Sequence, residues 1–336
     1  MGTPKGKPEM FTGIEDSDSL IHYTSAAGLA GILRSQTLWA SHYAYLNDQQ
    51  EIHTAREVMV EVFAKSLHSL FAKIKVDGTV DGILVDISPS TDLRQLATKA
   101  AEKYISVIHT VMLKYLDPYI LSFYLCSPDN NSSEYRNGSL RHWTSYGKSG
   151  GFAIEFGAKS IANACEQESN KFNHSGFHLI PVEYDLDLQK AERTPQVKEI
   201  NECLRHISKS QILESQPDEE VVRSSLLPYT MIASGIKNRH FQDEREARIV
   251  VYRPSSSDTY PSDSKVHPVH FRDTGGLHTP YIELFKQEEP KLPVTRVLVG
   301  PHPENELRVK SLELMLAELG REEISIEVSN IPYIDR

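Results

Sequence analysis

Hydrophobic and polar residues repeat along this chain with two different periods, and the periods divide the sequence into helices and strands. In the first third, apolar residues recur every three to four positions, a spacing typical of amphipathic helices. Leu29 and Leu33 follow this spacing behind Ser25, a residue type that commonly caps helices. Two long helices are predicted after it, over about 47–74 and 92–115. The first third is therefore expected to be mainly helical.

Alternating or continuous apolar runs predict strands, which dominate the second half of the chain. The predicted strands are 20–24, 37–41, 119–126, 152–156, 178–184, 245–252, 265–272, 281–285, 294–299 and 324–328. A helical segment over about 196–234 interrupts them, and Pro228 is expected to end or kink it because proline lacks a backbone donor. A last helix is predicted over 304–319. This order indicates a mixed α/β (α+β) fold without internal repeats.

The length of 336 residues permits one or two domains, and the pattern favours one. Residues 1–14 are polar and rich in glycine and proline, so they are predicted to be a disordered tail. Residues 15–336 are expected to form a single domain with helical insertions at about 47–116 and 190–238.

Composition narrows the class of protein. A hydrophobic share of 39% and a charged share of 24% are ordinary for a globular protein with a core. The net charge of −10 argues against a broad nucleic-acid groove, although a short basic groove remains compatible with it. No apolar run approaches the roughly 18 residues that span a bilayer, and the start MGTPKGKPEMFTG lacks the apolar core of a signal peptide. We therefore expect a cytoplasmic protein without membrane partners.

Cysteine and histidine spacing does not predict a metal site. Cys126, Cys165 and Cys203 have no CxxC spacing and are odd in number, which favours reduced thiols. His267 and His270 are close in sequence, but no acidic or cysteine partner has a recognisable ligand spacing.

The stretch WTSYGKSGGFAIEF contains a GKS but does not fit a phosphate-binding loop. Such a loop needs a glycine five places before Gly147, where this chain has His142, and a helix directly behind it. The residues that follow alternate like a strand instead. Trp143 and Tyr146, beside the glycines, could stack on a flat heteroaromatic ring. Alternatively, the aromatic residue could belong to the core and the glycines to a hairpin turn. The local pattern leaves both interpretations open.

A second group of polar residues lies near the N-terminus, in His22-Tyr23-Thr24, Ser41 and Asn47-Asp48. A histidine in an apolar strand is often a hydrogen-bonded core residue, and Asn47 and Asp48 are suited to capping a helix. The same amides and side chains could instead hold a ligand phosphate or ribose.

A third group lies in FQDEREARIV, at a predicted strand start. If the strand period already holds there, Glu244, Glu246 and Arg248 share one face, so two carboxylates lie close together at a sheet edge. Such acids can position hydroxyl groups or stabilise a developing cation. The alternative is a solvated strand start in which Arg248 pairs with Glu246.

Taken in order, these motifs resemble a bacterial family defined by a domain of unknown function. The motifs are HYT, LWAS with LNDQQE, W-x-x-YG with GFAIEF, F-x-x-E-x-E-x-R and VLVGP…SNIPY, and they span Leu20 to Tyr333. That family is similar to the ADP-ribosyltransferase superfamily. The resemblance implies an ADP-ribosyltransferase-like mixed β-sheet core with large helical insertions.

The resemblance also implies roles for individual residues. His22 would hold the NAD ribose with Thr24 nearby, and Tyr146 or Trp143 would frame the nicotinamide. Glu246 would be the catalytic acid, with Glu244 the upstream member of the pair. The remaining residues of the implied NAD-binding set are Tyr23, Ser41, Asn47, Asp48 and Arg248. The Ser-Thr-Ser element of one transferase class is missing, and the second-strand tyrosine pair of the other is not evident.

The expected function is that of an NAD-consuming ADP-ribosyltransferase, with NAD as substrate, no metal, and a protein or nucleic-acid acceptor. The resemblance suggests a toxin or phage-defence effector with a possible cognate antitoxin. Two alternatives stay open: an NAD glycohydrolase, and a non-catalytic nucleotide-binding module on the same fold.

Overall fold

The computed structural model describes residues 14–46, 51–127, 133–146, 150–172, 176–184, 191, 194–212, 219–254, 265–286 and 291–332. The predicted disordered tail lies outside this part of the chain except for Ile14, as do Asn47 and Asp48. None of the helices in the described part is both long and apolar enough to cross a membrane.

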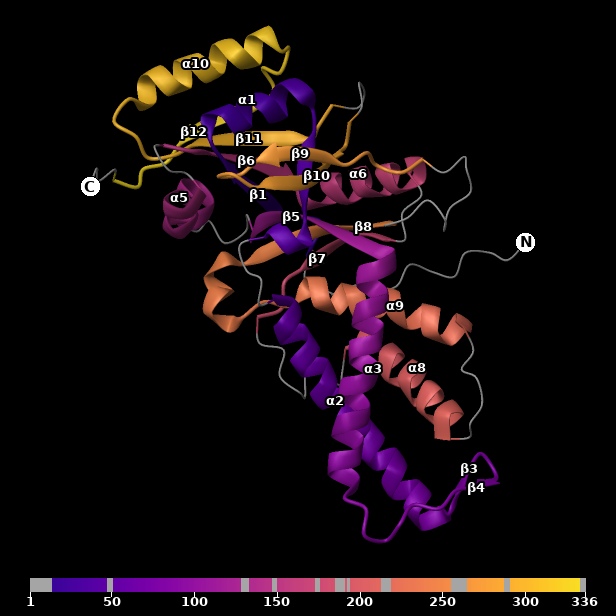
Figure 1. The fold of residues 1–336 in the computed structure, drawn as a ribbon. Helices are drawn as coiled ribbons and strands as arrows, with labels where there is room; N and C mark the ends of the chain where they lie inside the picture. Colours follow the sequence, from indigo (N-terminus) through magenta and orange to yellow (C-terminus); the bar gives the residue numbers. More distant parts are fainter. Residues whose placement is uncertain are drawn as a thin grey trace.

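A ten-stranded sheet forms the centre of the protein (Figure 1). Its main path runs β12 (Ser325–Val328), β11 (Val294–Val299), β6 (Phe152–Gly157), β1 (Ser19–Thr24), β5 (Leu116–Cys126), β2 (Leu38–His42), β10 (His278–Leu284) and β9 (His270–Asp273). β8 (Glu246–Pro254) pairs with β5 and with β7 (Gly176–Pro181). The named strands of this sheet pair antiparallel, apart from β11 and β12. The predicted mixed α/β class is confirmed.

The sheet forks at β5. One edge of β5 pairs with β8 along most of its length. Along the other edge, β1 pairs with residues 124–126 and β2 pairs with residues 119–120. Residues 121–123 of β5 pair with neither β1 nor β2, so the two strands diverge on either side of this short gap. The fork leaves an opening in the sheet that side chains of several distant segments can reach.

One face of the sheet is covered by α1 (Ala26–Ser35), α6 (Ala158–Lys171) and α10 (Asn305–Glu318). Leu29, Ile161 and Leu312 from these helices share a buried core with alternate residues of the strands. Ser25 caps α1 as predicted, because its hydroxyl oxygen accepts a hydrogen bond from the Gly28 backbone amide at 3.1 Å. α6 is a helix that the sequence pattern did not predict.

The opposite face carries a helical body, which occupies the lower part of Figure 1. It consists of α2 (Glu51–Asp77), α3 (Leu93–Tyr115), α8 (Pro195–Ile212) and α9 (Glu219–Gly235). These helices share one hydrophobic core with Ile120, Ile180 and Val250 of the sheet. A small hairpin, β3 (Thr79–Val80) and β4 (Ile83–Leu84), lies at its far end. Helices from both predicted insertions therefore stabilise each other.

The same face is covered at its other end by α4 (Ser133–Asn137) and α5 (Leu140–Tyr146). A cleft lined by residues 120–124 of β5 lies over the part of the sheet around the fork. Two short 3-10 helices border this region: η1 (Tyr43–Tyr45), after β2, and η3 (Arg239–Glu244), before β8.

Pro228 lies inside α9, which continues to Gly235, so of the two predicted effects the proline does not end the helix. Tyr229, Met231 and Ile232 directly behind the proline are buried in the helical body, and this burial offsets the hydrogen bond that proline removes. The strand expected from residue 265 begins at His270, where pairing with β10 begins.

Candidate functional site

A cleft of about 550 Å³ lies at the fork of the sheet, a volume in the range of small-molecule sites. Segments far apart in sequence meet in it, from β1, α1, β2, β5, α5, η3, β8 and β9. The residues predicted from sequence that line it are His22, Tyr23, Thr24, Ser41, Tyr146, Glu244, Glu246 and Arg248. The structure thus brings most of the predicted site together.

Strand periodicity explains why these side chains converge. On β8, Glu246 and Arg248 alternate with the buried Ala247 and Ile249, so both charged residues point to the face of α5 and the helical body. Arg248 lies opposite Ser122 of β5 in the antiparallel ladder. The cleft therefore has a sheet floor that carries charged groups at its centre.

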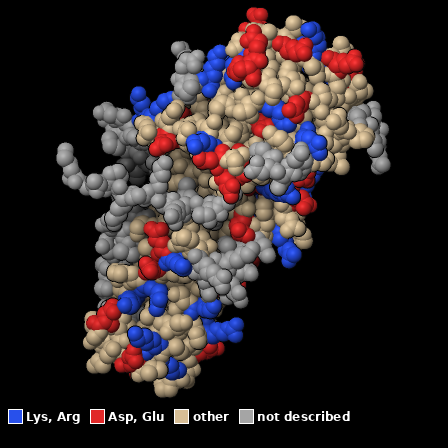
Figure 2. Space-filling model, turned by 180° about the vertical axis from the view of Figure 1, so that it is seen from behind, with Lys and Arg blue, Asp and Glu red and all other residues tan. Residues whose placement is uncertain are grey.

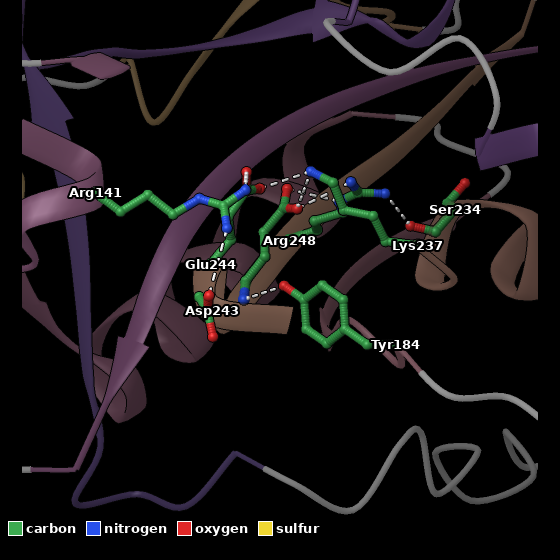
Figure 3. A network of polar contacts seen from close by, with 8 residues as sticks. Arg141, Tyr184, Ser234, Lys237, Asp243, Glu244 and Arg248 are labelled. Atoms are coloured by element: carbon green, nitrogen blue, oxygen red, sulfur yellow. Dashed lines mark hydrogen bonds and ion pairs between the residues drawn. The ribbon is translucent and has the colours of Figure 1, made fainter. Parts of the chain in front are cut away.

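Arg248 and Glu246 form a buried ion pair in the floor of the cleft (Figure 3). Arg248 Nε donates to Glu246 Oε1 at 2.7 Å, and Arg248 Nη2 donates to Glu246 Oε2 at 3.0 Å. Arg248 Nη1 also donates to the Ser234 carbonyl oxygen at 2.8 Å. The sequence pattern left open a solvated strand start in which Arg248 pairs with Glu246. The pairing is present, but the pair is buried and not solvated, since the Arg248 side chain is only 1% exposed.

Lys237 joins the two carboxylates of the predicted pair. Its ammonium group donates to Glu244 Oε2 at 2.8 Å and to Glu246 Oε2 at 3.0 Å. Arg141 extends the network, with Nη2 at 3.2 Å from Glu244 Oε1 and Nη1 at 3.6 Å from Asp243 Oδ2 (Figure 3). Acidic and basic groups alternate through this network, so each buried carboxylate has a cation beside it.

The ion pairs keep Glu246 ionised. Burial by itself would raise the pKa of Glu246, but the charge and hydrogen bonds of Arg248 outweigh it, with further contributions from Lys237 and Ser122. Together they lower the pKa to about 2. Glu246 is therefore an anion over the physiological range and does not act as a proton donor there.

This lowered pKa predicts a loss of stability in acid. In an unfolded chain the carboxyl of Glu246 has the ordinary glutamate pKa of 4.5, which exceeds the folded value of about 2, so its contribution to stability is fully present above pH 4.5. It is lost as the pH falls from 4.5 towards 2. We expect the free energy of unfolding, measured with urea, to decline across this window, and the ¹³C NMR signal of the Glu246 carboxyl to titrate near pH 2. A midpoint at or above 4.5 would contradict the prediction.

Glu244 does not lie on the strand, contrary to the pattern-based prediction. It is the last residue of η3, and Arg245 behind it has a φ of 38°, in the left-handed region, which turns the chain before β8 begins at Glu246. The two carboxylates are nevertheless adjacent because both bind Lys237. The turn, and not strand periodicity, places them together.

His22 lies in the gap of the fork. Its Nδ1 is 3.2 Å from the carbonyl oxygen of Ser122, a backbone group of β5 that neither β1 nor β2 pairs with. Burial lowers the pKa of His22; the hydrogen bond with the Ser122 carbonyl opposes this shift, and the nearby charge of Arg272 adds to it. Because a carbonyl oxygen only accepts, Nδ1 carries the proton in this bond. The core interpretation of His22 is thus supported by the contact, while the ring also lines the cleft.

Trp143 and Tyr146 have different positions. Trp143 is buried and does not line the cleft: its Nε1 donates to the Asn137 carbonyl oxygen at 2.9 Å, and its ring packs edge-on against Tyr23 at 4.9 Å. Tyr146, at the end of α5, lines the cleft with 45% of its surface exposed. Of the two aromatic candidates, only Tyr146 can contact a ligand there without rearrangement. Gly147 lies outside the described residues.

Sequence reasoning missed several cleft residues. His142 is 6% exposed and stacks on Tyr23 at 4.8 Å, and burial lowers its pKa to about 4. Lys237, Ser122 and Arg272 also line the cleft. No local signal marks them, because they come from separate segments that meet in the cleft only after folding.

The described part of the chain contains no group of three or more His, Cys, Asp or Glu side chains arranged to hold a metal. His267 is buried, stacked on Phe172 and 3.3 Å from Glu168, whereas His270 lies on β9 beside Tyr281. All three cysteines are free thiols; Cys126 and Cys165 are buried, whereas Cys203 is only partly buried.

A larger groove, of about 940 Å³, runs along α2 and α3. Mixed charged residues such as Arg56, Glu61 and Arg94 line it, and none of the predicted site residues does. On the face of the protein drawn in Figure 2, acidic and basic side chains are likewise interspersed. The cleft at the fork, with its aromatic rings and buried charges, is the better candidate for a functional site.

The comparisons with known proteins give one family for part of the chain. Residues 142–249 match the family described as "Protein of unknown function (DUF2971)". The matched segment runs from α5 into β8 and therefore includes Lys237, Glu244, Glu246 and Arg248. No match was found among curated proteins or among solved structures. The expected domain of unknown function is thus confirmed for this segment.

Proposed function

We propose that the protein is an NAD-dependent ADP-ribosyltransferase and that the cleft at the fork holds NAD. The observation that carries the proposal is the meeting of a carboxylate pair, an exposed tyrosine and an arginine in one cleft of the sheet. Glu246 and Glu244 supply the carboxylates, Tyr146 the ring and Arg272 the cation. These are the groups that a ribose, a nicotinamide and a diphosphate require.

In the proposed reaction, the bond between the nicotinamide nitrogen and the ribose carbon breaks and nicotinamide leaves with the electron pair. Positive charge builds on the ribose, and a carboxylate bound to its 2′-hydroxyl stabilises that charge in the transition state. A nucleophile of a protein or nucleic-acid acceptor then bonds to the ribose carbon and loses its proton. In a glycohydrolase, water would take the place of the acceptor.

The contacts of Glu246 impose a condition on this mechanism. A carboxylate offers about four acceptor sites; Arg248 and Lys237 together occupy three of them, and the Ser122 side chain also hydrogen-bonds to the Glu246 carboxylate. A ribose hydroxyl gains room if the Lys237 ammonium stays with Glu244 alone, which already binds it at 2.8 Å. Within the proposal, Glu246 is the catalytic carboxylate that stabilises the positive charge on the ribose, and Glu244 holds Lys237 away from it.

The same contacts favour a second candidate, a nucleotide-binding module without turnover. A carboxylate that is fully occupied by Arg248, Lys237 and Ser122 can be a structural ion pair. In that case the cleft would bind a nucleotide, and the acid pair would serve only to hold the floor of the cleft together.

The test is release of nicotinamide from NAD by the purified protein, with and without cell extract as a source of acceptor. We expect release by the wild type and its loss in Glu246→Gln. Asp243→Asn is the matched control, because the Asp243 side chain is 75% exposed and does not line the cleft. Nucleotide binding without release under either condition would overturn the proposal and favour the binding module.

A further inference from the structure

The end of the sheet formed by β2, β10 and β9 presents one open face that continues the cleft. Trp39 and Ser41 of β2 lie on this face, since Leu38 and Ala40, which alternate with them along the strand, are buried in the core on the other side. In the antiparallel ladders, Ser41 lies opposite Tyr281 and Tyr281 lies opposite His270. Trp39, Tyr281 and His270 therefore lie on the same side of the three strands.

These aromatic rings form a row across the three strands. Trp39 stacks on Tyr281 with ring centroids 4.3 Å apart and an interplanar angle of 29°, and His270 lies 5.5 Å from Tyr281. Trp39 is 42% exposed, although large aromatic side chains are usually well buried. An exposed, flat ring that is supported from behind is suited to stacking on a planar ligand.

Arg272 of β9 lies next to this row and inside the cleft wall. Its Nη2 donates to Ser41 Oγ at 2.9 Å, and its guanidinium carbon is 5.7 Å from the centroid of the Trp39 ring. In the described part of the chain, no carboxylate oxygen lies within 4.0 Å of the Arg272 guanidinium, so Arg272 forms no ion pair there. The buried Nε of Arg272 has no hydrogen-bond partner in the same part of the chain. The acid on this face, Glu283, is paired with Lys286 at 2.9 Å. Arg272 thus has capacity to bind an anion.

We propose that this face, made of Trp39, Tyr281, His270 and Arg272, binds a nucleotide unit. The base stacks on Trp39 and the phosphate binds Arg272. The row of rings suits a planar group, and the guanidinium suits an anion beside it, and a nucleotide carries both. We call this surface the nucleotide platform.

Two sources supply such a unit. One is the adenylate half of a dinucleotide, and in this form the inference rests on the proposed function. The other is a nucleotide of a single-stranded nucleic acid acceptor. The platform joins the central cleft through Ser41 and Arg272, which are hydrogen-bonded to each other and line both surfaces. The positive charge of Arg272 also lowers the pKa of His22 inside the cleft. A dinucleotide could therefore extend from the platform to Glu246.

The experiment measures binding of AMP and of adenosine by calorimetry, without any turnover. Arg272→Gln is expected to weaken the binding of AMP at least about tenfold and to leave the affinity for adenosine unchanged, because only AMP carries the phosphate. Trp39→Ala is expected to weaken the binding of both ligands about tenfold, because the base no longer stacks on the indole ring. Arg272→Lys should restore part of the AMP affinity. Lys310→Gln on α10, whose side chain is 67% exposed, is the control for the same change in net charge.

The outcomes separate this inference from the proposed function. AMP binding with the expected pattern, but without nicotinamide release from NAD, would retain the platform and reject the transferase. Competition between AMP and NAD identifies the dinucleotide source, and binding of an adenylate oligonucleotide at least tenfold tighter than AMP identifies the nucleic acid. AMP affinity that is absent, or unchanged by Trp39→Ala and Arg272→Gln in variants with wild-type melting curves, would overturn the inference.

Discussion

Replacement of Arg248 by methionine is expected to lower the free energy of unfolding by about 3–5 kcal/mol, the usual cost of removing one partner of a buried ion pair. Arg248 is 1% exposed and binds both oxygens of Glu246 as well as the Ser234 carbonyl. Methionine fills much of the same space but removes the positive charge and the two hydrogen bonds that Arg248 gives to the buried Glu246 carboxylate. Urea unfolding of the wild type and the variant measures the difference.

Arg245→Met provides the matched control on the same segment. Arg245 pairs with Glu134 at 3.2 Å, but the two side chains are 58% and 46% exposed, so we expect a change of about 0–1 kcal/mol. If Arg248→Met were as mild as this control, the buried pair would not stabilise the fold, and the floor of the cleft would have to be held by its apolar neighbours.

Replacement of Glu244 by glutamine is expected to reduce nicotinamide release about 100-fold, the scale of losing one electrostatic contribution to a transition state. In the wild type, Glu244 and Glu246 share the Lys237 ammonium at 2.8 and 3.0 Å. Without the Glu244 charge, the ammonium stays on Glu246 and occupies the site that the ribose hydroxyl needs. The initial rate of release at saturating NAD measures the effect.

Lys237→Met distinguishes this mechanism from a direct role of Glu244. The variant removes the ammonium and keeps the apolar stem, while Arg248 still neutralises Glu246. If Glu244 acts by holding Lys237, the double variant Glu244→Gln/Lys237→Met should recover most of the lost rate. A double variant as slow as Glu244→Gln alone would show that Glu244 contacts the substrate itself, and the proposed division of roles would be wrong.

The local pattern predicted much of the secondary structure correctly because the causes are local. Ser25 caps α1, and Asp92 caps α3 by accepting hydrogen bonds from the backbone amides of residues 94 and 95. Most strands begin and end within a few residues of their predicted limits. Pro228 does not end α9, because the packing of this helix in the helical body outweighs the local preference of proline.

The candidate site was predicted in part. Glu246 and Arg248 share a face because side chains alternate along a strand, a relation that the sequence contains. The position of Glu244 depends instead on the left-handed conformation of Arg245. Trp143 and Tyr146 are three residues apart on α5, yet one is buried and the other lines the cleft. Which face of a short helix meets the sheet cannot be derived from its own residues.

By itself, the sequence determined the mixed α/β class, the position of most elements and the shared face of Glu246 and Arg248, because these depend on side-chain period and on caps within a few residues. The tertiary structure alone decided the fork at β5, the meeting of Lys237 with both carboxylates, and the approach of Arg272 to Ser41 across a separation of 231 residues. Strand order and cleft composition result from long-range pairing, whose free energy comes from burial of the whole sheet between its helices.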